Sequence, residues 1–161
     1  MDVTIRPFVE ADIGQILPIW NDVVAEGAEF PQLELLTEKS APAFFSAQTL
    51  TAVAEKKGDI VGLYILHPNN VGRCGHIGNA SFAVKRSARG MHVGEAMARD
   101  CLEQARQLKF RILQFNAVVE TNVPAMKLYE KLGFVRLGTI PGGFLLNDGS
   151  YADISSYYRR L

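Results

Sequence analysis

The feature that most constrains the fold is a nearly continuous apolar run, Ile112 to Val119, between two helix-forming segments. A strand covered on both faces has such a run, because neither face needs polar side chains. The segment before it, Gly94 to about Leu108, carries one apolar stripe at helical spacing with charges on the opposite face. The segment after it has Pro124 in its first turn and stops at Gly133. A strand between two such helices predicts a sheet with helices packed on it.

The rest of the chain supplies further strands and two more helices. A helix is predicted from about Ala11, and a weaker one over 37–48. Four earlier strands are predicted, the last three as an antiparallel meander: Val3–Pro7, Leu50–Glu55, Ile60–His67 and about His76–Val84. One or two closing strands follow Phe134. This order, without a linker or a repeat, predicts a mixed α+β fold in a single domain over residues 1–161.

Composition narrows the class of partner. Hydrophobic residues make up 48% of the 161 residues, charged residues 21%, and the formal net charge is zero. Because no basic footprint is present, nucleic acid is not expected as a partner, and a small molecule is. The longest apolar stretches fall far short of the ~20 residues that cross a bilayer. Two cysteines, Cys74 and Cys101, and a start without an apolar leader predict a cytoplasmic protein with free thiols.

One segment, SFAVKRSARGMHVGEAM, has the pattern of a strand end, a loop with Arg89, Gly90 and Gly94, and a helix start. Free N–H groups at a helix N-terminus bind phosphate oxygens, and glycines let a ligand approach the backbone. The segment lacks the Gly-Lys-Ser/Thr of a Walker loop and the three glycines of the dinucleotide fingerprint. It therefore predicts an anion site, with an ordinary strand-to-helix turn as the alternative.

Two motifs resemble those of the GNAT acetyltransferases. Arg89-Gly90-Met91-His92-Val93-Gly94 resembles the family's Arg/Gln-x-x-Gly-x-Gly/Ala pyrophosphate loop, although His92 stands where the family usually has a glycine. The segment Asn122 to Phe134 resembles the family's Asn-x-x-Ala-x-x-Leu-Tyr-x-Lys-x-Gly-Phe element. Taken alone, Tyr129 in this second motif would be read as a core aromatic. The two motifs lie in the family's order, separated by a helix and a strand, and together they favour the resemblance.

The resemblance implies a GNAT-type fold. Such a fold has a central, twisted, mixed and mostly antiparallel sheet of about six or seven strands, splayed at the cofactor site and flanked by about four helices. Acetyl-CoA, without a metal, would lie between the strand ending near Val84 and the strand ending near Val119. The implied cofactor-binding residues are Phe82, Ala83, Val84, Arg89, Gly90, Met91, His92, Val93, Gly94, Asn122 and Tyr129.

The same resemblance implies roles in catalysis. Backbone N–H groups near Phe82 to Val84 would polarise the acetyl carbonyl, and the Tyr129 hydroxyl would protonate the leaving thiolate. An alkyl amine with a pKa near ~10.4 is almost fully protonated at pH 7, so a base or a water relay should remove its proton. Glu26, Glu120 and His76 are the candidates for this base, and no spacing singles out one of them.

The acceptor side is expected in the first helix and the loop after it. The stretch IWNDVVAEGAEFP resembles the acceptor-lining segment of small-molecule GNAT enzymes. Asn21, Glu26 and Phe30 in this stretch, together with His76, are the predicted substrate contacts. A metal site at Cys74 and His76 is not expected, because no matching ligand pair follows.

These observations predict an N-acetyltransferase that moves an acetyl group from acetyl-CoA to the primary amine of a small molecule. The amine would attack directly in a ternary complex, and a free amino acid or a related metabolite is the leading acceptor. A protein N-terminal acetyltransferase and a non-catalytic acyl-CoA-binding sensor are the alternatives. Because relatives of this kind are commonly dimers, a homodimer is also expected.

Overall fold

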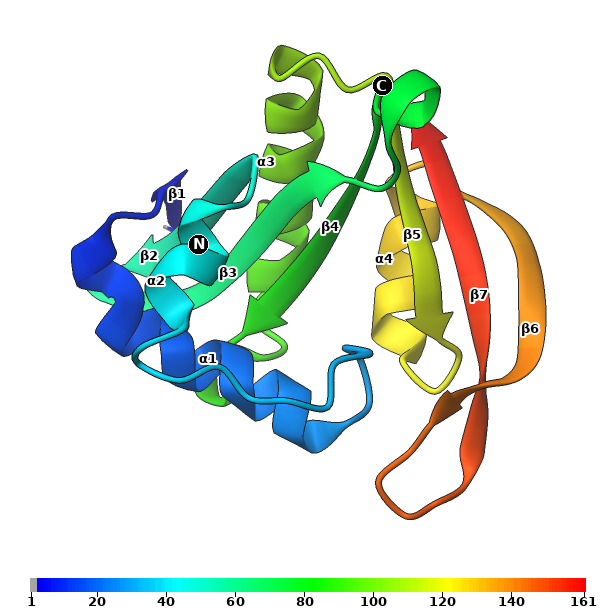
Figure 1. Cartoon of the computed structure of the whole chain (residues 1–161), viewed down its shortest axis with the longest axis horizontal. Helices are drawn as coiled ribbons and strands as arrows, with labels where there is room; N and C mark the ends of the chain where they lie inside the picture. The colour runs from blue at the N-terminus through cyan, green and yellow to red at the C-terminus, as the bar shows by residue number, and fades with distance from the viewer. Residues whose placement is uncertain (1–2) are drawn as a thin grey trace.

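The computed structural model describes residues 3–161, which form one seven-stranded sheet in the order β1-β2-β3-β4-β5-β7-β6 (Figure 1). Its strands are β1 (Thr4–Pro7), β2 (Leu50–Lys56), β3 (Asp59–Pro68), β4 (Ile77–Val84), β5 (Ile112–Val119), β6 (Val135–Leu145) and β7 (Tyr151–Arg160). Over the same residues the α-helices are α1 (Ile13–Glu26), α2 (Ala41–Ser46), α3 (Val93–Gln107) and α4 (Val123–Lys131). All strand pairs except β4–β5 are antiparallel, so the predicted mixed and mostly antiparallel sheet is confirmed.

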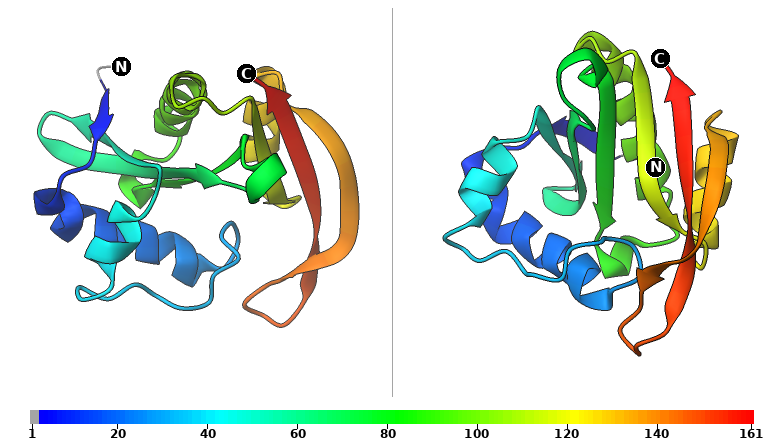
Figure 2. Two further views of the ribbon diagram at one scale, coloured as in Figure 1. Left: turned by 45° about the horizontal axis from the view of Figure 1, so that its top comes forward. Right: turned by 45° about the vertical axis from the view of Figure 1, so that its right-hand side comes forward.

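Helices cover both faces of the sheet (Figure 2). On one face, α1 buries Ile16, Trp20 and Val23 together with α2 and inward side chains of β2 and β3. On the other face, the apolar stripe of α3 packs with side chains of α4 and β5 in a second core cluster. The helical spacing seen in the sequence therefore marks the buried side of α1 and of α3.

The sheet opens between β4 and β5. These parallel strands pair only through Ile77 with Ile112 and Gly78 with Leu113. The start of this opening is tightly packed, because a β-carbon on Gly78 would lie 3.2 Å from the Phe110 ring. Beyond Gly78, no strand within residues 3–161 pairs with β4 on the side that faces β5. The splay expected between the ends of these strands is therefore present (Figure 1).

The prediction that β5 is covered on both faces was wrong for its middle part. Leu113 and Phe115 are buried, whereas Gln114 is half-buried and Asn116 is exposed. The two polar side chains bond to each other, with Gln114 Nε2 donating to Asn116 Oδ1 at 3.1 Å. Asn116 Nδ2 in turn donates to Asn69 Oδ1 at 2.7 Å. This face of β5 is an amide-lined wall and not a second core surface.

The chain closes with two strands, β6 and β7, which form a hairpin at the far edge of the sheet (Figure 1). The loop of this hairpin reaches the end of α1, where Asn147 Nδ2 donates to the carbonyl oxygens of Ala25 at 2.9 Å and Glu26 at 3.1 Å. The hairpin thus holds the end of α1 beside the splay. None of the helices within residues 3–161 is long and apolar enough to cross a membrane.

Candidate active site

The loop predicted to bind an anion leads into the N-terminus of α3. A short 3-10 turn, Arg86–Ala88, follows β4, and Val93 begins the helix. Gly90 has φ 77° and His92, the N-cap, has φ 60° and ψ 18°, so both lie in the left-handed region. The first N–H groups of a helix have no partner within the helix, and its dipole adds a partial positive charge. The loop therefore presents donors suited to phosphate oxygens.

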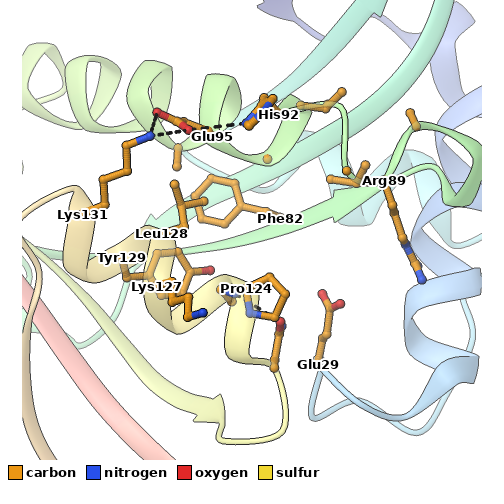
Figure 3. Close-up of a pocket in the computed structure, with 18 of the residues that line it drawn as sticks. Glu29, Phe82, Arg89, His92, Glu95, Pro124, Lys127, Leu128, Tyr129 and Lys131 are labelled. Carbon is orange, nitrogen blue, oxygen red and sulfur yellow. Dashed lines mark hydrogen bonds and ion pairs between the residues drawn. The ribbon is translucent and has the colours of Figure 1, made fainter.

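A pocket of about 480 Å³ extends from this loop along the splay to α4 (Figure 3). It is lined by Val23, Glu29, Phe82, Val84, Ala88, Arg89, Gly90, His92, Val93, Gly94, Glu95, Ala98, Asn122, Pro124, Ala125, Lys127, Leu128, Tyr129 and Lys131. Arg89 and Lys127 bring positive charge to its walls, and Lys131 Nζ lies 2.9 Å from Glu95. We call this the larger pocket. Its positive charge and free N–H groups suit a ligand with several phosphates.

Tyr129 and Asn122 lie on α4 and its N-cap. Asn122 Oδ1 accepts a hydrogen bond from the Ala125 N–H at 3.3 Å, which caps the helix. The Tyr129 ring packs on Phe115 and Phe134, with centroid separations of 4.5 and 5.6 Å, and its hydroxyl points into the larger pocket (Figure 3). Burial, and secondly the nearby negative charge of Glu29, raise the pKa of Tyr129 well above its usual value. The hydroxyl is therefore protonated at neutral pH and can donate a proton.

A second pocket, of about 270 Å³, adjoins the first. It is lined by Glu29, Phe30, Pro31, Gln32, His67, Asn79, Ala80, Ser81, Phe82, Phe115, Asn116, Ala117, Val118, Val119, Asn122, Ala125 and Tyr129. We call it the smaller pocket. The residues common to both pockets are Glu29, Phe82, Asn122, Ala125 and Tyr129. The Tyr129 side chain thus stands where two separate binding spaces meet.

Most of the predicted cofactor residues line the larger pocket, namely Phe82, Val84, Arg89, Gly90, His92, Val93, Gly94, Asn122 and Tyr129. Two do not. Ala83 is fully buried and packs in the core cluster beneath α1, because alternate residues of β4 point to opposite faces. Met91 lies within the loop and is 44% exposed. Of the predicted acceptor residues, Phe30 lines the smaller pocket and packs on Trp20 at a centroid separation of 4.6 Å.

Glu26, predicted as a base and an acceptor contact, lines neither pocket. Its Oε1 accepts from Arg89 Nη2 at 2.8 Å and from Arg86 Nη2 at 3.0 Å. The hydrogen bond from Arg89, together with that from Arg86, lowers the pKa of Glu26. A carboxylate held in this way is a weaker base, and in this structure it fixes Arg89 to the end of α1.

The other predicted residues also lie outside both pockets. Glu120 Oε1 accepts from Ser155 Oγ at 2.8 Å and from Thr139 Oγ1 at 3.2 Å, so it ties β5 to the closing hairpin. Asn21 exchanges two hydrogen bonds with the backbone of Leu36, at 2.8 and 2.9 Å, and thereby anchors the loop after α1. His76 is exposed just before β4, at the opposite end of that strand from Val84.

Glu29, which the sequence did not single out, lines both pockets. Burial raises the pKa of Glu29 and the nearby Glu26 adds to this effect, while Arg89 partly opposes both. No periodic pattern marks a loop residue of this kind. The lysines of the larger pocket did leave a signal, because Lys127 and Lys131 are spaced by one helical turn and share a face of α4. Among residues 3–161, no group of three or more His, Cys, Asp or Glu is arranged to hold a metal ion.

Comparison with known proteins agrees with this geometry. The model of the acetyltransferase (GNAT) family matches residues 17–134. The N-acetyltransferase aca1 of Schizosaccharomyces pombe is 35% identical over 108 residues, which cover 66% of this chain and 52% of the yeast protein. This chain therefore spans about half the length of that relative.

Solved structures match over nearly the whole chain. A GCN5-related N-acetyltransferase from Kribbella flavida has a TM-score of 0.91 and 34% identity, covering 99% of this chain and 98% of its own. A GNAT superfamily phosphinothricin acetyltransferase from Sinorhizobium meliloti, in complex with acetyl-CoA, has a TM-score of 0.91 over 100% and 89% of the two chains. At 22% identity, the latter shows a shared fold. From its fold, its pyrophosphate-type loop and the family match, the chain belongs to the GNAT family of acetyltransferases.

Proposed function

We propose that this chain transfers an acetyl group from acetyl-CoA to the primary amine of a small molecule by direct attack in a ternary complex. The observation that carries the proposal is that Tyr129 lines both pockets where they meet. A direct transfer needs the donor carbonyl and the acceptor nitrogen in contact at one point, with an acid beside the leaving sulfur. Two adjoining pockets around one protonated hydroxyl meet this requirement.

The larger pocket fits the donor. The first-turn N–H groups of α3 and the Lys127 ammonium would bind the phosphates. The unpaired edge of β4 would bind the pantetheine amides as a neighbouring strand does. Backbone N–H groups near Phe82 to Val84 would then face the thioester carbonyl and stabilise the oxyanion that forms there.

Each bond change can then be assigned to a group. The amine nitrogen attacks the carbonyl carbon, and the C–S bond breaks as the tetrahedral intermediate collapses. The leaving thiolate takes the Tyr129 proton. A phenol has an ordinary pKa near ~10, so the hydroxyl is protonated at the start of each turnover at neutral pH.

The smaller pocket favours a small acceptor over a peptide. Its volume of about 270 Å³ falls below the ~300–1,000 Å³ of pockets that hold drug-sized ligands. Asn147 also ties the closing hairpin to the end of α1, which narrows the approach that an extended peptide would need. A free amino acid or a related metabolite matches this size. A cytoplasmic homodimer remains part of this proposal.

Two measurements test the proposal. Acetyl-CoA at about 100 times its Kd should stabilise the protein by about 2.7 kcal/mol and raise its melting temperature. A panel of amino acids, polyamines, aminoglycosides and short peptides, read by release of free thiol, should give turnover with a small amine. No thermal shift would remove the donor assignment. A shift without turnover on any amine would favour the sensor, and turnover on peptides alone would favour the N-terminal acetyltransferase.

A further inference from the structure

We propose that Glu29 is the catalytic base, and that the acceptor amine enters the smaller pocket as an ammonium ion that this carboxylate holds and then deprotonates. The proposal rests on the function proposed above and goes beyond it. It assigns the base to a particular residue, and it states that the acceptor amine is protonated when it enters the pocket.

The position of Glu29 is the first argument. A base for this reaction must reach the nitrogen at the point where donor and acceptor meet. Among the described residues common to both pockets, Glu29 carries the one carboxylate. In Figure 3 its carboxylate extends from the loop after α1 into the space between Pro124 and Arg89. Tyr129 lines the same two pockets as Glu29, so the base and the acid face the same space.

The loop that carries Glu29 is held in place on both sides. The next residue, Phe30, is buried against Trp20. Before it, the end of α1 is tied by Asn147 to the closing hairpin. Further along the loop, Asn21 holds Leu36 through two hydrogen bonds. The carboxylate is therefore presented by an anchored segment, as a catalytic group requires.

The charged and titratable groups around Glu29 come from several elements. Glu26 and Arg89 act on it from α1 and the pyrophosphate-type loop, and they are bonded to each other at 2.8 Å. Tyr129 and Lys127 line the larger pocket from α4. Because the hydrogen bond of Arg89 goes to Glu26, Glu29 keeps its own oxygens for an acceptor. Its raised pKa moves toward the working pH, where a general base is most effective.

His67, from β3, is the remaining titratable side chain of the smaller pocket. Its Nδ1 lies 2.9 Å from the carbonyl oxygen of Pro68. His67 does not line the larger pocket, so it lies away from the point where the pockets meet. Position therefore favours Glu29 over His67 as the base.

The protons balance as follows. The ammonium gives one proton to the Glu29 carboxylate, which passes it to solvent, and the neutral nitrogen attacks the thioester. The Tyr129 hydroxyl gives its proton to the thiolate as the C–S bond breaks. The second proton lost by the nitrogen replaces the one that Tyr129 gave. The net products are the amide, the free thiol and one proton.

The test compares Glu29→Gln with Glu34→Gln, a matched change at an exposed carboxylate of the same loop. The probe is acetyl-CoA with the amine of the panel that the wild-type protein turns over fastest, and kcat/KM is measured from pH 6 to 10. At pH 7 we expect Glu29→Gln to lower kcat/KM about 100-fold or more. The deficit should shrink as the pH approaches the pKa of the amine, because its neutral fraction rises about tenfold per unit. Glu34→Gln should stay within about twofold of wild type.

The outcomes separate this proposal from the function beneath it. A wild-type protein that is active, with a Glu29→Gln variant of equal kcat/KM at every pH, would overturn the role of Glu29 and leave the acetyltransferase intact. A loss confined to KM and constant with pH would also overturn it, since Glu29 would then hold the amine without taking its proton. No turnover by wild type would overturn both proposals. If Glu29→Gln does not fold, Glu29→Asp replaces it, with a smaller loss and the wild-type pH dependence expected.

Discussion

Replacing His92 by glycine should stabilise the protein. His92 has φ 60° and ψ 18°, a left-handed conformation that costs a residue with a β-carbon about 1–2 kcal/mol. Glycine adopts it without that cost but loses more entropy on folding, so we expect a net gain of about 1 kcal/mol. The side chain contributes little, because it is 79% exposed and its Nδ1 lies 3.8 Å from Glu95. For a chain of this size, the gain corresponds to a rise of about 2–4 °C in melting temperature.

The assay is calorimetric unfolding of His92→Gly beside His92→Ala. The alanine variant loses the same side-chain contacts but keeps a β-carbon, so it should melt near the wild-type temperature. The thermal shift given by acetyl-CoA should be kept or increased in the glycine variant, since the helix N-terminus is unchanged. Equal melting temperatures for the two variants, or a lower one for His92→Gly, would refute the argument from backbone strain. A marked weakening of the acetyl-CoA shift would mean that the imidazole itself contacts the cofactor.

Three further predictions follow from the site and the core. Tyr129→Phe should lower kcat at least about 100-fold and keep the acetyl-CoA thermal shift; an unchanged kcat would remove its role as the acid. Hydrogen bonds from Lys131 and, secondly, from Arg99 lower the pKa of Glu95 from 4.5 to about 2. The stabilisation that Glu95 provides is therefore complete above pH 4.5 and is lost as the pH falls toward 2. The melting temperature of Glu95→Gln should therefore fall less than that of wild type over that pH range, and equal falls for the two proteins would contradict this. In urea, Leu113→Ala, at a residue 1% exposed, should cost about 2–5 kcal/mol, whereas Leu137→Ala, at one 58% exposed, should cost under about 0.5; similar costs would contradict the burial pattern.

Much of the fold could be predicted because local patterns and tertiary packing agree. The apolar stripe of α3 is the surface that the structure buries, and the proline and glycine around α4 mark its two ends. His92 stands where the family usually has a glycine, and its backbone explains that preference, because it has the left-handed conformation that glycine adopts freely. The covering of β5 was overpredicted although Gln114 and Asn116 interrupt the apolar run. Two amides in an eight-residue strand were a sign that one face meets a polar space.

The direction of the carboxylates could not be predicted, because contacts distant in sequence decide it. The Glu26 carboxylate is turned toward Arg86 and Arg89, and Arg89 is more than sixty residues away from it in the sequence. Glu120 is held by two hydroxyls of the closing hairpin. Glu29 lines the pockets because Trp20 and Asn21, both on α1, hold the loop that carries it. In the sequence all three are acidic residues near predicted element ends, and only the fold distinguishes them.

The two-residue pairing of β4 with β5 has a mechanical consequence. Within residues 3–161, strand pairing joins β1 to β4 with β5 to β7 only at Ile77–Ile112 and Gly78–Leu113. The remaining connection between the two halves of the sheet comes from packing, because the core cluster that includes α3 contains side chains from both halves. Asn147 adds a second connection, from the closing hairpin to the end of α1. A molecule lying in the splay would therefore add contacts between two halves of the sheet that share few backbone hydrogen bonds.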